Sequence, residues 1–468
     1  MGWSSRVKGF FGVQDMTTGK PMNKLIRFSL PLLVGNLAQQ LYNTVDSIVV
    51  GKYVGDTALA AVGTAGPILN LLLVLLIGVA TGASILASQY FGAKDREGLS
   101  RVVGSTIVLT VLSGLIMMVL GYFTSSLLIG LIAPPPDVAE GAVTYLKIIF
   151  LGMLGASAYN ILSGVLRGMG DSFYPLVYLV LACLLNIVLD ILFVARFHMG
   201  VAGVAWATII AQAISGVLCL IRLVGMKDLI DINARTLTPD GPITRRLCQL
   251  GLPAGITQGL FSMSAIVVQG LTNSMGTAVI AANVAIMRVD GFAMMPNFTF
   301  GTTSTTYVGQ NIGAGHIDRV RQGIRDMLKL ALATSGVLVA CILLFGRQLI
   351  QLFTDTEDVI TIGVYGLRWL SLGYIAFAVS QVLQGAMRGA GETMIPMWIS
   401  IIATILIRLP LAWLLAFLTR SQAWPRGNPQ ALFASLLISW VLAMVMTVIA
   451  HRKGAWRRRL PQQLEEQV

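Results

Sequence analysis

Long apolar segments recur twelve times along the chain, separated by short stretches that are polar or contain glycine. A helix needs about 20 mainly apolar residues to cross the hydrocarbon core of a bilayer, so each segment is long enough to span a membrane. The pattern therefore predicts an all-α polytopic membrane protein with twelve transmembrane helices. We expect them at residues 25–54, 57–90, 98–132, 137–167, 173–197, 200–224, 246–274, 278–311, 319–353, 357–388, 393–419 and 429–451.

Composition supports this prediction and leaves little room for a soluble domain. Of the 468 residues 55% are hydrophobic and 12% are charged, with a mean hydropathy of +0.77. An ordinary soluble domain has about 25% charged residues. The N-terminal segment is polar and lacks the short apolar core of a removable signal peptide, so insertion is expected to begin at the first helix.

The net charge of +12 raises the question of a nucleic-acid partner, which the placement of the charges answers. Most of the 33 Lys and Arg residues fall in segments that are cytoplasmic if both termini are inside the cell. This is the distribution that the positive-inside rule describes. We therefore expect no nucleic acid, a multi-pass protein of a prokaryotic inner or plasma membrane with both termini cytoplasmic, and anionic-lipid contact at the basic tail.

The second half of the chain repeats the first. At an offset of 221, three motifs match: 55–61 with 276–282, 89–93 with 310–314, and 164–171 with 385–392. At an offset of 222, Leu30-Pro31 matches Leu252-Pro253. Each half holds six predicted spans, an even number, so the halves are parallel. This predicts two parallel six-helix bundles related by a pseudo-two-fold axis along the membrane normal.

These observations divide the chain into five regions. A polar stretch rich in turn-forming residues separates the two halves. The predicted regions are a cytoplasmic N-terminal segment at 1–24, an amino-terminal lobe with helices one to six at 25–224, a cytoplasmic linker at 225–245, a carboxyl-terminal lobe with helices seven to twelve at 246–451, and a basic cytoplasmic tail at 452–468.

The glycine-rich stretch 167–171 and its repeat 388–392 invite comparison with a phosphate-binding loop. No strand precedes either copy, as such a loop would require. An arginine, two glycines and an acidic residue between two spans fit a tight helix reversal with an orienting charge. We interpret both copies as structural turns.

Asp46 lies in the middle of the first apolar segment and is the residue that any function must explain. Polar residues at a spacing of three to four place it on one helix face with Asn36, Gln39, Gln40, Asn43 and Ser47. A charge at the bilayer centre costs about 2.5 to 3.5 kcal/mol on insertion scales, so it normally faces a bundle interior or a watery cavity and serves transport. The structural alternative is a carboxylate that only hydrogen-bonds a neighbouring helix.

The fifth segment carries a second carboxylate where the repeat is broken. Asn186 and Asp190, four residues apart on one helix face, correspond to Ile407 and Leu411 in the second half. With Asp46 and Thr208 they supply only oxygen ligands and hydrogen-bonding groups. Such a set suits a proton or a hard cation such as Na⁺ and does not suit zinc. No cofactor is expected.

The second half carries different chemistry, with Arg288, Asp290 and Arg408 in apolar segments and many methionines. Methionine is flexible and polarizable, which suits promiscuous binding surfaces, although ordinary packing explains any single one. Because Arg288 and Asp290 cannot face each other on a helix, we expect a cross-helix pair such as Asp290 with Arg408. The residues that we expect to line a substrate cavity are Asn36, Gln39, Asn43, Gln258, Met287, Asp290, Met294, Phe298 and Arg408.

Together these residues resemble the multidrug and toxic compound extrusion (MATE) family, in its bacterial DinF-like or MepA-like branch. The resemblance covers essentially the whole chain. The motifs that carry it are Pro31 with Asp46, 51–63, 89–93, 167–171, Asn186 with Asp190, 285–292 and 308–315.

The resemblance implies twelve helices in two lobes, alternating access, and efflux of amphiphilic, often cationic compounds driven by Na⁺ or H⁺ entry. By similarity the cation site falls on Asp46, Asn186, Asp190 and Thr208, and Pro31 is where the first helix can bend. Some branches carry an essential glutamate in the seventh helix, and this sequence has none there.

The expected function is therefore a secondary active multidrug antiporter, acting as a monomer among membrane lipids on small amphiphilic molecules. A lipid-linked oligosaccharide flippase shares the superfamily fold and is the main alternative. Its cavity would be expected to be lined with arginines, whereas here carboxylates occupy the amino-terminal lobe. An intramembrane aspartyl protease is a third possibility, disfavoured by the internal repeat and by the lack of paired active-site motifs. We expect no enzyme activity.

Overall fold

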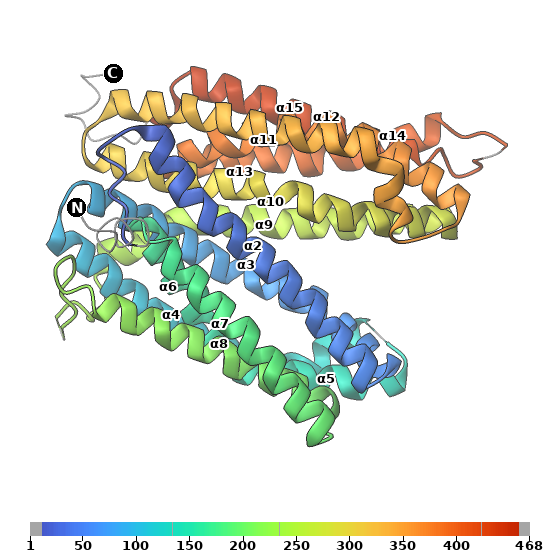
Figure 1. Cartoon of the computed structure of the whole chain (residues 1–468), viewed down its shortest axis with the longest axis horizontal. Coiled ribbons are helices and arrows are strands. Elements are labelled where there is room, and N and C mark those ends of the chain that lie inside the picture. Colours follow the sequence, from blue (N-terminus) through green and yellow to red (C-terminus); the bar gives the residue numbers. More distant parts are fainter. Residues whose placement is uncertain (1–11, 133, 234, 423, 458–468) are drawn as a thin grey trace, which may run out of the picture. The chain divides into compact units, whose positions relative to one another are not determined.

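In the computed structural model the described residues of the chain form twelve consecutive helical spans, which are drawn in Figure 1. The structure describes residues 12–132, 134–233, 235–422 and 424–457, without the side chains of Asn43, Ser47, Asp56, Leu71, Leu72 and Ala455. The spans are α2 (Pro21–Tyr53), α3 (Asp56–Gly92), α4 (Arg96–Ile132), α5 with α6 (Pro136–Leu151 and Met153–Gly168), α7 with the π-helix η1 (Phe173–Asp190 and Ile191–Arg196), α8 (Gly200–Val224), α9 (Gly241–Ser274), α10 (Thr277–Gly313), α11 (Ile317–Gln351), α12 (Glu357–Gly389), α13 with the π-helix η2 and α14 (Met394–Ile401, Ile402–Arg408 and Leu409–Leu418), and α15 (Gln430–Arg452). A short 3₁₀ turn, η3 (Ala455–Arg457), follows.

The predicted fold class, an all-α polytopic membrane protein with twelve helices in two six-helix bundles, is confirmed. Within the described residues, ten helices are long and apolar enough to cross a membrane, and the bent pair α5 and α6 makes an eleventh. The remaining span is α2, the helix that carries the polar stripe. The protein is a multi-pass membrane protein.

Three spans are less regular than the sequence predicts. The fourth span breaks at Gly152, where α5 and α6 meet at 55°. A Cβ on Gly152 would lie 2.2 Å from the Ile209 side chain, so the absence of a side chain lets the break pack closely against α8. The fifth span ends in η1 and the eleventh contains η2, and such π-helical turns often occur at functional sites.

The chain packs into two compact units, and two helices change unit along their length. Unit 1 comprises residues up to Thr18 and Ile26–Gly255, and unit 2 comprises Gly19–Leu25 and the residues from Ile256 onward. In α9, Leu247 and Leu250 are buried in a core of unit 1, while Leu271 is buried in a core of unit 2. The first turn of α2 likewise belongs to unit 2 although the rest of the helix belongs to unit 1.

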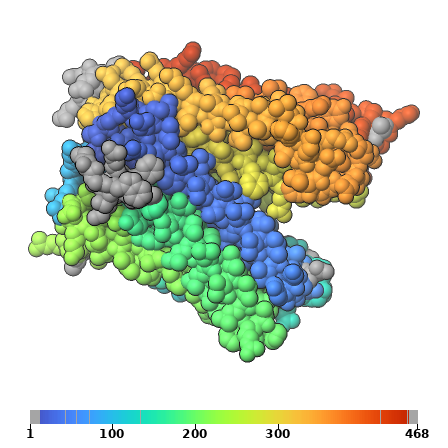
Figure 2. All heavy atoms as spheres, viewed as in Figure 1, coloured from blue at the N-terminus to red at the C-terminus, as the bar shows by residue number. Residues whose placement is uncertain are grey.

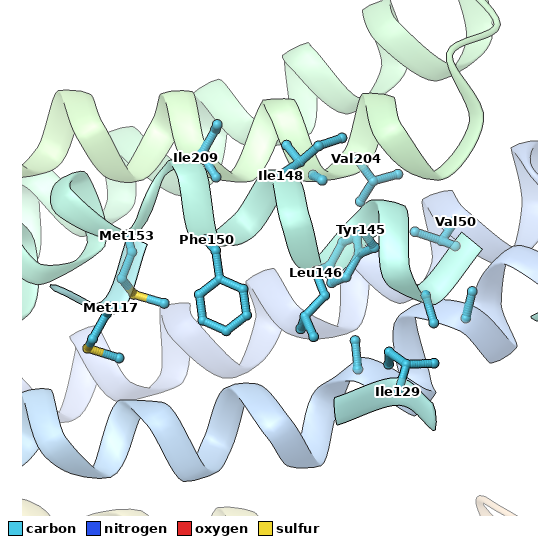
Figure 3. Packing of buried hydrophobic residues seen from close by; sticks show 14 of the residues in the cluster. Val50, Met117, Ile129, Tyr145, Leu146, Ile148, Phe150, Met153, Val204 and Ile209 are labelled. Carbon is cyan, nitrogen blue, oxygen red and sulfur yellow. The ribbon is translucent and has the colours of Figure 1, made fainter. Parts of the chain in front are cut away.

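A core of unit 1 is built by residues of α2 to α6, η1 and α8 (Figure 3). Phe150 is fully buried, and its ring lies where a Cβ on Gly121 of α4 would be. Burial of a large apolar side chain contributes about 1.5–3 kcal/mol, so this cluster holds α5 against α4. Tyr145 belongs to the same cluster and is 6% exposed.

The internal repeat is visible in how helices touch. In unit 1, Cβ atoms on Gly164 and Gly168 of α6 would lie 2.8 and 2.4 Å from the carbonyl oxygens of Ala80 and Ser84 on α3. In unit 2, Cβ atoms on Gly385 and Gly389 of α12 would lie 2.2 and 2.4 Å from the carbonyl oxygens of Gly301 and Thr305 on α10. The four contacts correspond at an offset of 221. Small residues thus let the same pair of backbones approach closely in both halves.

The two glycine-rich turns have the structural role that the sequence indicates. Gly170 and Gly391 adopt φ of 90° and 88°, which favour glycine. Asp171 accepts a hydrogen bond from the Tyr174 N–H (3.1 Å), and Glu392 accepts from the Met394 N–H (3.0 Å). Each acidic side chain therefore satisfies a free N–H at the start of the following helix.

Candidate functional site

The carboxyl groups of Asp46 on α2 and Asp190 at the end of α7 lie against each other within unit 1. Asp190 is 0% exposed, and it is the last α-helical residue before η1. In the space-filling view the blue atoms of α2 lie along the green atoms of α7 (Figure 2). Gly35 of α2 lies beside Leu176 of α7, since a Cβ on Gly35 would be at an ordinary contact distance, 3.5 Å, from the Leu176 side chain.

Asn186 connects Asp190 to α8. In the amide orientation that satisfies both neighbours, its nitrogen donates to Asp190 Oδ2 (2.9 Å) and its oxygen accepts from the Thr208 N–H (3.1 Å). Asn186 is 0% exposed, so replacing it would leave buried polar groups unpaired. The Thr208 hydroxyl donates to the Val204 carbonyl (3.0 Å) and keeps its lone pairs toward the site. The structure thus brings together all four residues of the predicted cation site.

Two tyrosines that were not among the predicted residues also belong to this site. Tyr42 lies one helical turn before Asp46, and its hydroxyl is in contact with Thr208. Tyr145 of α5 lies near both Asp46 and Asp190. The spacing of four residues between Tyr42 and Asp46 could have predicted Tyr42 as a site residue, because it places the two side chains on one helix face. Nothing in the local sequence distinguishes Tyr145 from a packing residue.

The donor atoms of the site suit a proton or a hard monovalent cation. Asp46 Oδ1 and Asp190 Oδ1 are buried and have no hydrogen-bond partner. Two carboxylates, an amide and hydroxyl groups offer oxygen alone, which is the preference of hard cations. Among the residues that the structure describes, no three His, Cys, Asp or Glu side chains gather into a cluster of the kind that holds zinc. The oxygen donors of the site suit a proton or Na⁺.

The rest of the α2 stripe extends from this site toward Pro31. The helix is continuous through Pro31, whose side chain is buried. Gln39 is half-buried and Asn36 is exposed. The Asn43 side chain lies outside the described part of the chain. The amide residues of the stripe thus lie along α2 between Pro31 and Asp46.

A second buried polar cluster lies within unit 2. Asp290 of α10 lies beside the Tyr374 hydroxyl of α12, and Arg408 at the end of η2 is near enough to interact with it electrostatically. Arg408 Nη1 donates to the Ser264 hydroxyl (3.4 Å), and the described contacts include no ion pair between Asp290 and Arg408. Asp290 Oδ1, Arg408 Nε and the Tyr374 hydroxyl are buried without a hydrogen-bond partner. The expected cross-helix proximity is present without a direct ion pair.

The remaining predicted cavity residues differ in exposure. Met287 is 57% exposed and Phe298 is 47% exposed, with the Phe298 ring edge-on to Phe377 at 5.5 Å. Met294 is only 9% exposed and lies in a hydrophobic core of unit 2, where it packs rather than presents a surface. Gln258 is half-buried on α9. Met287 and Phe298 are therefore exposed enough to contribute to a substrate surface on this unit, whereas Met294 is buried.

A repeat-built, all-helical membrane protein with a buried carboxylate pair is typical of secondary transporters. The MatE family model matches the chain twice, at residues 31–192 and 253–414. The chain belongs to the MatE family. The two matches begin 222 residues apart, in agreement with the internal repeat, and the family predicted from the sequence is confirmed.

Relatives of similar length match almost end to end. "Probable multidrug resistance protein YpnP" of Bacillus subtilis is 29% identical over 443 residues, covering 95% of this chain and 97% of that protein. "Probable multidrug resistance protein YoeA" of the same organism is 31% identical, covering 88% of this chain and 91% of that protein. A crystal structure described as MATE in the bent conformation has a TM-score of 0.88 and 23% identity, covering 97% of this chain and 98% of that one. This structural match concerns the fold alone.

Proposed function

We propose that the protein is a secondary active multidrug antiporter, which exports amphiphilic, often cationic compounds in exchange for Na⁺ or H⁺. Membership of the MatE family supports this, as do the printed names of YpnP and YoeA, which describe probable multidrug resistance proteins. The observation that carries the proposal is the contact between Asp46 and Asp190 inside the membrane-spanning part of unit 1.

Ion binding follows from the electrostatics of that pair. Two ionised carboxylates in contact repel each other, and burial removes the water that would screen them. The pair therefore favours uptake of one proton, which the two groups share, or of a Na⁺ ion. Asn186 orients Asp190, and Thr208 with Tyr42 supplies neutral oxygen atoms at the same site.

Neutralising the pair can change the shape of α2. While both carboxylates are charged, repulsion and poor solvation favour separation of α2 from α7 and entry of water. Once a cation or proton is bound, α2 can close onto α7. Pro31 removes one backbone hydrogen bond of the helix, so a bend at this position requires less energy than elsewhere in α2.

Export then requires that ion and compound bind with negative coupling. Closure of α2 narrows the space beside the stripe, so the ion-bound form holds the compound less tightly. Linkage requires each ligand to weaken the other by the same factor, typically about 5- to 150-fold. The substrate residues in this proposal are Asn36, Gln39 and Asn43 of α2, and Gln258, Met287, Asp290, Phe298 and Arg408 of unit 2.

The flippase alternative fits less well. The names of the relatives concern drug resistance, and the buried charges of unit 1 at this site are carboxylates. We further propose that the protein acts as a monomer, in contact with membrane lipids in a prokaryotic inner or plasma membrane, with both termini cytoplasmic. The predicted linker at 225–245 and the two predicted lobes are part of this proposal.

Transport by purified protein in proteoliposomes tests the function. A fluorescent cationic dye is loaded, and Na⁺ and pH gradients are imposed separately. The proposal expects dye movement that depends on one of the two gradients and stops when that gradient is collapsed. Dye movement that is the same with and without either gradient would show that the protein is not an ion-coupled antiporter.

A further inference from the structure

The chain enters α2 through a segment that belongs to the other unit. Residues 12–18 belong to unit 1, Gly19–Leu25 belong to unit 2, and the chain returns to unit 1 at Ile26. We call residues 19–25 the tether. The same helix carries Asp46, about 30 Å beyond the tether at 1.5 Å per residue, with Pro31 between them. The ion-binding helix thus begins in unit 2.

Arg319 of α11 fixes the tether within unit 2. Its Nη1 donates to the Gly19 carbonyl oxygen (2.9 Å), and its Nε donates to Asn311 Oδ1 (3.1 Å). The donors of a guanidinium group have a rigid fork geometry, so the bond to Asn311 orients the group for its bond to Gly19. At the other end of the tether, Leu25 is fully buried. Both ends of the tether are therefore held.

The partners that orient Arg319 are themselves fixed at the junction of α10 and α11. Asn311 is 0% exposed and donates from Nδ2 to the Tyr307 carbonyl (2.8 Å). The Tyr307 hydroxyl donates to the Arg319 carbonyl (3.1 Å). Gly323 allows this arrangement, because the Tyr307 ring occupies the place of its missing Cβ. The guanidinium is thus oriented by the buried Asn311 and reaches out to the exposed Gly19.

The residues before the tether are fixed to unit 1. The Gln14 N–H donates to the Gly170 carbonyl (3.0 Å), and a Cβ on Gly170 would lie 2.2 Å from the Gln14 carbonyl oxygen. Met16 is fully buried. Asp15 Oδ1 accepts from the Thr17 N–H (2.8 Å), which closes a local turn. The residues before Thr18 are therefore packed against unit 1, whereas Thr18, Gly19 and Lys20 are exposed, and Arg319 contacts this short stretch at Gly19.

The internal repeat shows that the scaffold does not require this arginine. At an offset of 221, Arg319 and Asn311 correspond to Gly98 and Tyr90 in the first half. These two positions also touch, since a Cβ on Gly98 would lie 2.4 Å from the Tyr90 ring. The contact is kept in both halves, but the second half has an arginine at this position where the first half has glycine; the first half places its arginine two residues earlier, where Arg96 Nη2 donates to the Lys227 carbonyl oxygen (2.6 Å) before α9. The repeat is thus broken at the residue that holds the tether.

We propose that Arg319 is a positioning residue that couples the ion-binding helix to unit 2. By holding Gly19, it converts a change in the shape of α2 into movement of unit 2. Without it, the ion still binds at Asp46 and Asp190, and α2 still bends, but the bend is taken up by the loose tether. This inference rests on the proposed antiport function and adds the path by which the ion site acts.

Arg319→Ala tests the coupling in proteoliposomes. We expect the purified variant to bind dye and ion with affinities within about twofold of wild type, while ion-driven export falls at least about tenfold, a difference of about 1.4 kcal/mol. Arg325→Ala is the matched control, because Arg325 is an exposed arginine on the same helix. It should export as wild type does. If Arg319→Ala does not fold, Arg319→Lys replaces it, and export lowered at least about threefold is expected since one ammonium cannot reproduce the guanidinium fork.

A cross-link distinguishes coupling from a purely structural role. In a background with the exposed cysteines changed, Cys248→Ser and Cys341→Ser, the pair Lys20→Cys and Arg319→Cys is joined by a short bifunctional thiol reagent. We expect low export before the reaction and restored export after it, because the covalent link replaces the hydrogen bond. A structural role alone predicts no restoration.

Two results would overturn the inference. The first is export at the wild-type level by Arg319→Ala, or by Arg319→Lys if the alanine variant does not fold. The second is failure of the cross-link to restore export. Both are judged against a wild-type protein that exports dye under an ion gradient. If wild type itself shows no ion-dependent export, the proposed function fails instead, and the two failures are told apart in the same assay.

Discussion

Asp46 of α2 and Asp190 of α7 lie 144 residues apart in the sequence and contact each other, and each keeps one buried carboxylate oxygen without a hydrogen-bond partner. Two acidic side chains in contact, with one buried oxygen each left free, are the geometry on which the proposed binding of a cation or proton rests.

Asp46→Asn should abolish coupled export while leaving the fold intact. The amide has the size of the carboxyl group but cannot be neutralised by an ion, so the pair loses its switch. We expect gradient-driven dye export in proteoliposomes to fall at least about tenfold. Asp137→Asn, an exposed change in the first turn of α5, is the control and should export normally. Full export by Asp46→Asn would refute the role of Asp46.

Asn186→Ala should weaken both stability and ion binding. The change leaves Asp190 Oδ2 and the Thr208 N–H without their partner, at a cost of about 1–3 kcal/mol for a buried unsatisfied group. Thermal unfolding in detergent, measured across Na⁺ concentration and pH, should show a lower midpoint and a smaller stabilisation by the coupling ion. Asn160→Ala removes an amide that donates to Ala156 in its own helix and serves as control. An unchanged ion response in Asn186→Ala would exclude Asn186 from the site.

Gly389→Ala should destabilise unit 2 through the contact between α12 and α10. The added Cβ would lie 2.4 Å from the Thr305 carbonyl oxygen, and backbone atoms cannot move aside as a flexible side chain can. We expect a loss of about 1–3 kcal/mol, typical of overpacking. Gly336→Ala on α11 meets no atom within 4 Å and should be neutral or slightly stabilising. Equal unfolding temperatures for the two variants would contradict the close approach of α10 and α12.

Much of the architecture could be predicted from the sequence because bilayer thickness imposes a minimum length on each span. The predicted ends of most spans lie within a few residues of the observed ones, and the largest difference is α9, which begins at Gly241 rather than at residue 246. The break at Gly152 and the π-helical turns η1 and η2 were not predicted. A π-turn shifts the hydrogen-bond ladder by one residue and has no hydrophobic period of its own.

The candidate site was accessible to sequence reasoning where polar chemistry stands out against an apolar background. Asp46, Asn186 and Asp190 are such residues, and the structure brings them together. Tyr145 could not be found in this way, because a tyrosine in an apolar helix is usually a packing residue. Met294 was predicted to line a cavity, but hydropathy cannot say which face of a helix a methionine occupies in a core. The lining role of the other side chains stays a prediction.

Topology is open to a direct test with single cysteines. We expect a cysteine at position 235, in the predicted linker, to resist labelling by a membrane-impermeant thiol reagent added outside intact cells. A cysteine at position 56, at the start of the second span, should react. Labelling of position 235 from outside, or protection of position 56, would contradict cytoplasmic termini.

Equilibrium binding of dye to the purified protein, measured across Na⁺ concentration and pH, addresses the central claim most directly. The account predicts that the coupling ion weakens dye binding by about 5- to 150-fold, that dye weakens ion binding by the same factor, and that Asp190→Asn removes the effect. Independent binding of the two ligands, or an ion effect that persists unchanged in Asp190→Asn, would contradict the claim that the Asp46–Asp190 pair drives export.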